Sequence, residues 1–96
     1  MSEVQAQIVM TAEANAFSVA AYVSSSVARP LNWTLTVDAK GRAGSTVTVQ
    51  RGRTDGRSHA PVSVSRVNAP GYAVLEVSDR GETVARADKT FGERDG

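Results

Sequence analysis

Apolar residues recur at every second position along most of this chain, a period that predicts β-strands with one buried face. The clearest run follows Pro30, where the alternating apolar positions are Leu31, Trp33, Leu35 and Val37. The lone Trp at the second of these positions predicts the centre of a core, because one indole buries on the order of 200 Å². Stacking of Trp33 on a ligand is the alternative interpretation.

Two further strands are expected before this run. The alternating apolar positions are Val4, Ala6, Ile8 and Met10 in the first strand, and Phe17, Val19, Ala21 and Val23 in the second. Residues 13–16 are expected to form the hairpin turn between them. An Ala-rich helix over residues 12–23 is the competing interpretation. The spacing of two and the serines at 24–26 favour a strand.

A turn and a fourth strand are predicted by residues 41–50. Gly41 and Gly44 supply the permissive backbone that a chain reversal needs. The residues that follow alternate polar with β-branched side chains, and this pattern predicts that Val47 and Val49 point into the core.

Three shorter strands complete the predicted fold. The fifth strand has Ala60, Val62 and Val64 on its inward face, and Pro61 suggests an edge or strand start. The sixth strand spans 72–78, with Ala73, Leu75 and Val77 pointing inward. The seventh strand spans 83–90, and Phe91 is expected to cap the core. Seven strands at spacings near ten residues predict an all-β, seven-stranded antiparallel immunoglobulin-like β-sandwich. A small barrel is the second choice. We expect one domain over residues 1–96, ordered from about 4 to 91, with 92–96 as a flexible tail.

Composition excludes several kinds of site. The 96 residues contain no Cys, so disulfides and thiolate chemistry are impossible, and the one His with ten scattered carboxylates gives no metal-binding spacing. No serine lies in a Gly-x-Ser-x-Gly motif, and His59 has no orienting acid beside it in the sequence. We therefore expect neither an enzyme nor a cofactor.

Charge and hydropathy also limit the partners. The net charge is +1 and no long basic run is present, which argues against nucleic acid as the main partner. No apolar run approaches the roughly 20 residues that cross a bilayer, and no signal-peptide pattern opens the chain. We expect no membrane partner and, if the protein is exported, a mature form.

A local cluster of basic residues is hidden by the small net charge. Five of the eleven basic residues fall between positions 40 and 57, where Asp55 is the one acidic residue: Lys40, Arg42, Arg51, Arg53 and Arg57. Arg51 and Arg53 are odd-numbered like Val47 and Val49, so an unbroken strand would point them into the core as well. A bulge or strand end at Gly52 is expected to turn them into solvent instead. The cluster is either a solvated face that aids solubility or a surface that captures an acidic or polar partner.

Several short motifs resemble a known family. They are Leu35-Thr36-Val37, the run from Lys40 to Gly52, the strand from Tyr72 to Val77 and the hairpin from Asp79 to Val84. These motifs resemble the periplasmic curli-assembly chaperones of the CsgC and CsgH type, most of all the CsgH branch, whose members carry a similar strand ending in a Gln-x-Gly turn. The resemblance covers roughly residues 31–90.

The resemblance implies a function without covalent chemistry. It implies an immunoglobulin-like periplasmic protein, expected to be a monomer, that keeps the disordered major curli subunit from forming amyloid by transient binding. The family supplies no catalytic or ligand residue to transfer, so the client-binding hypothesis rests on charge and exposure alone. It comprises the five basic residues, with the polar strand from Ser45 to Gln50 beside them. An adhesion or carbohydrate-binding module is the second hypothesis, and a small enzyme is the third.

Overall fold

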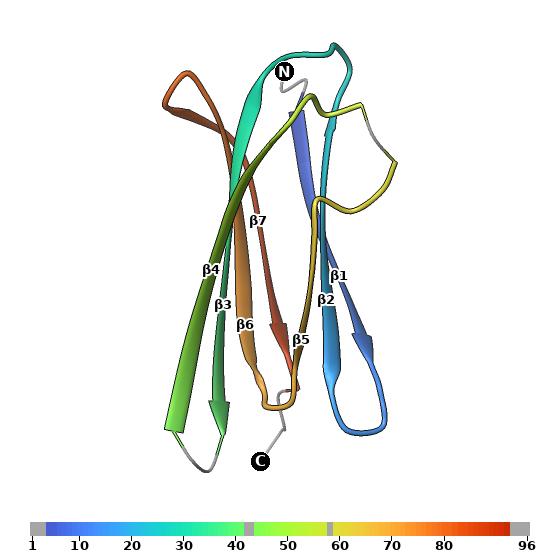
Figure 1. The fold of residues 1–96 in the computed structure, drawn as a ribbon, viewed down its shortest axis with the longest axis vertical. Helices are drawn as coiled ribbons and strands as arrows, with labels where there is room; N and C mark the ends of the chain where they lie inside the picture. The colour runs from blue at the N-terminus through green and yellow to red at the C-terminus, as the bar shows by residue number, and fades with distance from the viewer. Residues whose placement is uncertain (1–3, 42–43, 58, 93–96) are drawn as a thin grey trace.

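Seven antiparallel strands form two facing sheets in residues 4–41, 44–57 and 59–92, the part of the chain that the computed structural model describes (Figure 1). The strands are β1 (Val4–Ala12), β2 (Phe17–Ser25), β3 (Leu31–Gly41), β4 (Gly44–Thr54), β5 (Ser63–Val67), β6 (Gly71–Asp79) and β7 (Glu82–Phe91). The predicted all-β sandwich is confirmed. The tail expected at 92–96 falls outside the described residues except for Gly92.

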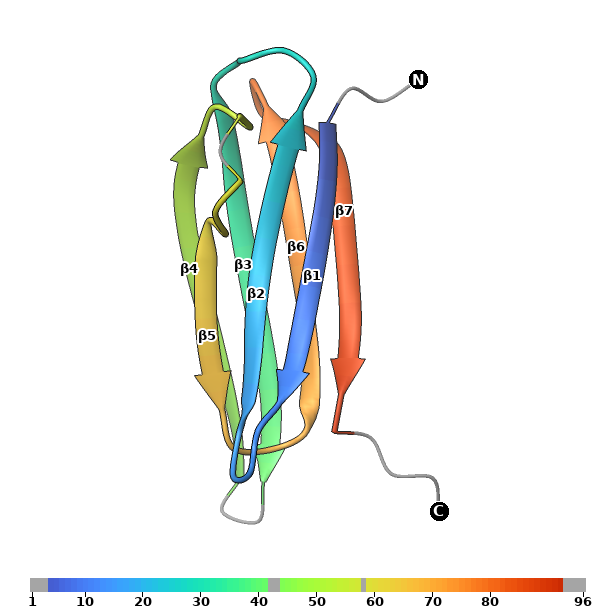
Figure 2. The same ribbon diagram turned by 90° about the vertical axis from the view of Figure 1, so that its right-hand side faces the viewer.

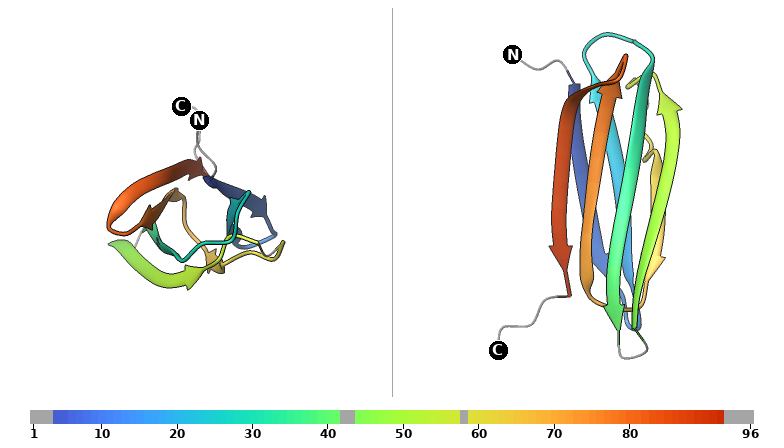
Figure 3. Two further views of the ribbon diagram at one scale, coloured as in Figure 1. Left: turned by 90° about the horizontal axis from the view of Figure 1, so that it is seen from above. Right: turned by 90° about the vertical axis from the view of Figure 1, so that its left-hand side faces the viewer.

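The strand order explains the shape of the sandwich. One sheet has the order β1-β2-β5 and the other the order β4-β3-β6-β7 (Figure 2). On one side β1 runs beside β7, and seen from above this side is closed (Figure 3). On the other side β4 and β5 are both edge strands, and no ladder joins them. We call this the open side of the sandwich.

The core lies between the two sheets, where most of the predicted inward positions meet. The predicted inward faces of β1, β2, β3 and β6 are confirmed: the fully buried side chains include Val19, Leu31, Leu35, Leu75, Val77 and the predicted cap Phe91.

The helix considered for residues 12–23 is wrong, because the hairpin turn and β2 occupy them, with Glu13 N–H donating to Ala16 O over 2.8 Å. In the described ranges, no helical segment has the length and apolarity that crossing a bilayer requires.

The contact between Trp33 and Gly52 fixes the register of β3 with β4. The two residues are direct partners across the ladder, and a Cβ on residue 52 would lie 2.6 Å from Cζ2 of the indole. Only glycine fits beneath the ring. The pairing of Leu35 with Gln50 and of Val37 with Thr48 follows from this register.

This register makes the predicted orientation of Val47 and Val49 wrong. Directly opposite residues in antiparallel strands share a face, so the partners of the buried β3 residues must point inward. These partners are the even-numbered residues of β4. Val47 and Val49 are therefore on the outer face, where they are 60% and 49% exposed.

The bulge expected at Gly52 is also wrong. The ladder between β3 and β4 runs without a register shift to Thr54, so the Gln50-Arg51-Gly52 segment is strand and not turn. Arg51 and Arg53 face solvent because odd-numbered residues of β4, like Val47 and Val49, point to the outer face of the sheet. The register shift in the described sheets lies instead between Val77 and Ser78, opposite β7.

The fifth strand differs from its prediction in the same way. It spans Ser63–Val67, and Val64 is 55% exposed, whereas Ser63 and Ser65 face the interior. Its register with β2 places Ser65 opposite buried Val19. The inner faces of both strands at the open side are therefore largely polar, and Val67 is the residue of β5 that packs against the core.

Replacing Gly52 by Ala tests this register. Because the new Cβ would overlap the indole of Trp33, we expect Gly52→Ala to lower the free energy of unfolding by about 1–3 kcal/mol in urea denaturation. Gly41→Ala is the control, since its Cβ would meet Ala69 at an ordinary 3.4 Å, and a change within about 0.5 kcal/mol is expected. Equal effects of the two substitutions would contradict the role of Gly52.

Candidate functional site

Arg51 and Arg53 project from the outer face of β4. Each is exposed, and their cross-strand neighbours on β3 are the uncharged Thr34 and Asn32. Two residues along a strand correspond to about 7 Å, so the two guanidinium groups originate close together. Neither makes an ion pair within the described part of the chain. The predicted exposure of both arginines is confirmed.

Arg57 lies beyond the end of β4 and is held by backbone carbonyls. Its Nη1 donates to Ser26 O over 2.8 Å and to Ser25 O over 3.2 Å, and its backbone N–H donates to Asp55 Oδ1 over 2.9 Å. Gly56, buried beside Ser25, accepts from the Ser25 amide over 2.8 Å. These bonds fasten the segment after β4 to the end of β2 and hold the charge of Arg57 there, at the same end of the sandwich as Arg53.

The structure separates Lys40 from these arginines. Lys40 is exposed at the far end of β3, next to Ser45, whereas Arg53 is next to Asn32. Eight residues of strand separate Asn32 from Lys40, a distance of about 26 Å at roughly 3.3 Å per residue. Arg42 lies outside the described residues. The predicted cluster is therefore two sites in space, and Arg51, Arg53 and Arg57 form one of them.

One basic residue that the sequence reasoning missed lies at the same end. Arg80 occupies the turn between β6 and β7 with a φ of 56°, and it is exposed. The pairing of Asn32 with both Arg53 and Ser78 brings this turn toward the end of β4. Arg80 is far from the cluster in sequence, so only the strand order could reveal it.

Other arginines have carboxylate partners. Arg29 Nη1 lies 3.3 Å from Asp79 Oδ2, and Arg66 Nη2 lies 2.6 Å from Glu13 Oε1. Arg86 lies between Glu76 and Asp88, at 4.0 and 3.9 Å. These pairs neutralise the charge of their arginines, whereas exposed Arg51 and Arg53 pair with no carboxylate among the described residues.

Apolar side chains continue the surface along β4. Val49, Thr36 and Val74 lie side by side across three strands, and exposed Tyr72 lies one row further along. The outer side of β4 thus runs from two valines to two arginines, and we call Val47, Val49, Arg51 and Arg53 the β4 stripe. Such a surface offers apolar contact and planar donors for carboxylates and carbonyl groups together.

Gln50 joins the two sheets across the open side. Its Nε2 donates to Ser65 Oγ over 3.1 Å, and its Oε1 accepts from the Ser63 hydroxyl. The sequence placed Gln50 at the end of the polar strand beside the basic cluster. It did not predict this link between the sheets, because the partners of Gln50 come from the fifth strand, whose orientation was predicted wrongly.

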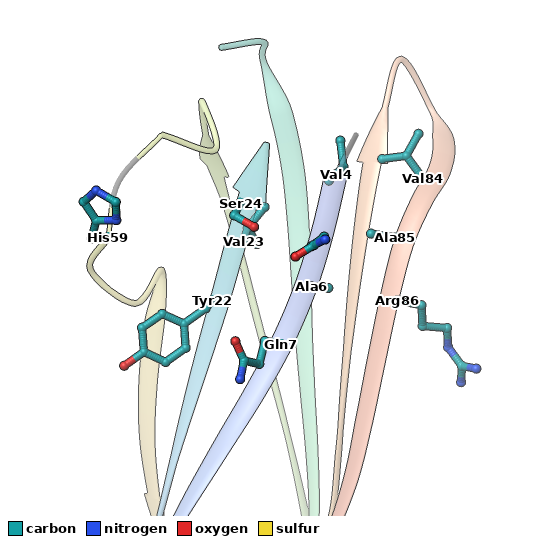
Figure 4. Close-up of a pocket in the computed structure, with 11 residues that line it drawn as sticks. Val4, Ala6, Gln7, Tyr22, Val23, Ser24, His59, Val84, Ala85 and Arg86 are labelled. Carbon is teal, nitrogen blue, oxygen red and sulfur yellow. The ribbon is translucent and has the colours of Figure 1, made fainter. Parts of the chain in front are cut away.

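The pocket that includes His59 does not assemble a catalytic group. It has a volume of about 610 Å³ along the outer side of β1 and β2, and His59 and Arg86 lie at its opposite ends (Figure 4). No carboxylate is among the described residues that line it, so His59 has no acid there to orient it. Within the described ranges, no group of three or more potential metal ligands is present.

Trp33 belongs to the core, as predicted, and not to a binding platform. It is 8% exposed and packs over Gly52. Tyr72, at 46% exposed, is the large aromatic side chain that the described surface presents most openly. A sugar-binding module stacks rings on exposed aromatic residues, and this surface offers little for that purpose.

Comparison with known proteins gives two structural matches. The E. coli curli protein CsgC superposes with a TM-score of 0.69 at 14% identity, covering 88% of this chain and 96% of its own. The solution structure of R. palustris CsgH superposes with a TM-score of 0.65 at 21% identity, covering 88% of this chain and 91% of its own. The chain has the fold of these two curli proteins.

The comparison supports the resemblance at the level of fold and does not favour CsgH over CsgC. CsgH has the higher identity, but CsgC has the higher TM-score. Neither the protein-family models nor the curated proteins gave a match to this sequence.

The bonds of Arg57 predict a stability effect that its neighbours lack. We expect Arg57→Ala to lower the free energy of unfolding by about 1 kcal/mol, because two carbonyl groups lose a charged donor. Arg53→Ala removes no described bond and should change it by less than about 0.5 kcal/mol. Urea denaturation of both variants measures the difference, and equal stabilities would show that the Arg57 bonds contribute nothing.

Proposed function

We propose that this protein is a periplasmic chaperone that delays amyloid formation by the disordered major curli subunit through transient, non-covalent binding. The fold shared with CsgC and CsgH supports a role connected with curli. The observation that carries the proposal is the β4 stripe, where two arginines that pair with no described carboxylate lie beside exposed valines.

The stripe suits an unfolded client better than a folded one. A disordered chain presents backbone carbonyls, scattered carboxylates and isolated apolar side chains, and a guanidinium group donates to carbonyls and carboxylates in a planar geometry. Valines spaced two residues apart contact apolar side chains along an extended segment. Each contact is weak, so the client binds and leaves quickly, and the growth of a cross-β nucleus is delayed.

Electrostatic attraction sets the rate of encounter. Oppositely charged surfaces associate up to several orders of magnitude faster than neutral ones at low salt. Arg51, Arg53 and Arg57 lie at one end of the four-stranded sheet, with Arg80 in the adjacent turn, so this end is the expected site of first contact. Lys40 lies too far away to act with them.

The direct test follows curli-subunit aggregation by dye fluorescence with substoichiometric amounts of the protein. We expect a longer lag time with the wild-type protein. An unchanged lag time would reject the proposed function.

Charge reversal at the stripe should weaken the delay. We expect Arg51→Glu with Arg53→Glu to require about tenfold more protein for the same lag time, because the client meets like charge instead of attraction. Lys40→Glu with Lys89→Glu changes the net charge equally away from the stripe, because Lys40 is at the far end of β3 and exposed Lys89 is on β7, the opposite edge of the sheet from β4. This variant should retain most of the delay. If the two double variants behave alike, net charge and not the stripe controls the encounter.

Salt should have the same effect on the wild-type protein as charge reversal. The Debye length falls from about 30 Å at 0.01 M to about 3 Å at 1 M salt, so attraction between exposed charges is lost. We expect the delay to shrink as ionic strength rises, with the spontaneous lag time of the client measured at each salt concentration. A delay independent of salt would show that apolar contact alone accounts for binding.

A further inference from the structure

We propose that the first half of β4, from Gly44 to Val49, is a strand-acceptor site that binds an extended polypeptide segment with uncharged polar side chains. This inference rests on the proposed function, because it specifies how the client would be held after the encounter. Its evidence is separate: the free edge of β4 and the groove beneath that edge.

The backbone of β4 has free hydrogen-bonding groups along its outer edge. The amide of Lys40 donates to Pro70 O over 2.8 Å, on the β6 side of β3. Successive residues of a strand point their amides to alternate sides, so Ala39 and Val37 point toward β4, and their partners Thr46 and Thr48 point back. The N–H and C=O groups of Ser45, Val47 and Val49 are therefore directed at the open side.

This edge lacks the features that usually protect edge strands. Natural sheets block an edge with proline, bulges, inward-pointing charge or a very short strand. Residues 44–49 contain no proline or charged residue, and their pairing with β3 shows no register shift. The opposite edge of the gap, β5, spans only Ser63–Val67.

A groove lies on the inner side of the same edge. It has a volume of about 710 Å³ and is lined by Thr46 and Thr48 of β4, by Asn15 and Asn68 of two loops, and by Val37 and Ala39 on its floor. Thr46 and Thr48 are exposed although they share the inward face, so no strand covers them. A strand added to β4 would point every second side chain into this groove.

The lining of the groove determines which side chains fit. Hydroxyl and amide groups from Thr46, Thr48, Asn15 and Asn68 can exchange hydrogen bonds with serine, threonine, asparagine or glutamine. The charged residue among the described lining is Arg66, and Glu13 neutralises it. An isolated charge on the bound segment would lose water without gaining a partner, so uncharged polar side chains are favoured.

Gln50 marks the end of the site. Its bonds to Ser63 and Ser65 close the gap between the sheets just beyond Val49. The accessible edge is therefore about six residues, or roughly 20 Å, long. Arg51 and Arg53 follow directly, so a client attracted by these charges reaches the edge without moving to another face.

The first experiment measures the edge amides directly. The labelled protein is titrated with a capped eight-residue peptide that alternates glutamine and serine, and amide exchange is followed by NMR. We expect slower exchange at Val47 and Val49, with little change at Thr46 and Thr48, which already face β3. The same peptide with every residue N-methylated should bind at least about fivefold more weakly, because it has no N–H donors on either edge. Unchanged exchange at Val47 and Val49 would overturn the proposal.

A matched pair of variants tests the same edge in the client assay. Val49→Pro removes an N–H that faces the open side and leaves the ladder to β3 intact, whereas Val49→Thr keeps both the N–H and the branched shape. We expect Val49→Pro to lose peptide protection and at least half of the aggregation delay, and Val49→Thr to retain both. Circular dichroism checks that each variant folds. If Val49→Pro does not fold, the N-methylated peptide still decides the outcome.

The outcomes separate this inference from the proposed function. If the wild-type protein delays aggregation and Val49→Pro delays it equally, strand addition is rejected and the proposed function stands. If aggregation is unaffected but the peptide protects Val47 and Val49, the proposed function fails and the acceptor site stands. Sedimentation that shows a dimer, with these amides protected in the absence of peptide, would mean that a second copy occupies the edge and would overturn the proposal.

Discussion

The surface of this protein depends on one contact inside it, the indole of Trp33 over the bare backbone of Gly52. No other residue than glycine fits at position 52 without displacing the ring. This fit determines which residues of β4 pair with the buried residues of β3 and point inward. The residues between them therefore point to solvent. A shift of the ladder by one residue would turn Arg51 and Arg53 toward the core and move the threonines to the outer face. The exposed charge is thus a consequence of core packing.

The open side of the sandwich inverts the usual polarity of a sheet. Threonine, glutamine and serine face inward on β4 and β5, whereas Val47, Val49 and Val64 face solvent. The inversion is tolerated because the dense core lies further in, around Val19, Leu35 and Leu75. At the open side the sheets meet through the Gln50 side chain, so polar groups there remain hydrogen-bonded or hydrated.

The sequence predicted the fold well where apolar side chains alternate with polar ones, as in β1, β2, β3 and β6. It failed in β4, because threonine and valine are both β-branched and the pattern does not say which of them is buried. Only the partner strand decides, through Trp33. The sequence also predicted too large a basic cluster. In an antiparallel hairpin, residues close in sequence, such as Lys40 and Arg51, can lie at distant points along the paired strands. Arg80, remote in sequence, joins the same end through the strand order.

The position of the arginines next to the free edge has a colloidal consequence for the protein itself. A long unblocked strand invites its own copies to pair, which is the usual origin of sheet-to-sheet aggregation. Two copies that paired in parallel through β4 would bring their guanidinium groups side by side, and this repulsion disfavours such self-association at low salt. The same residues thus oppose parallel pairing of the protein with itself while the strand beside them stays open.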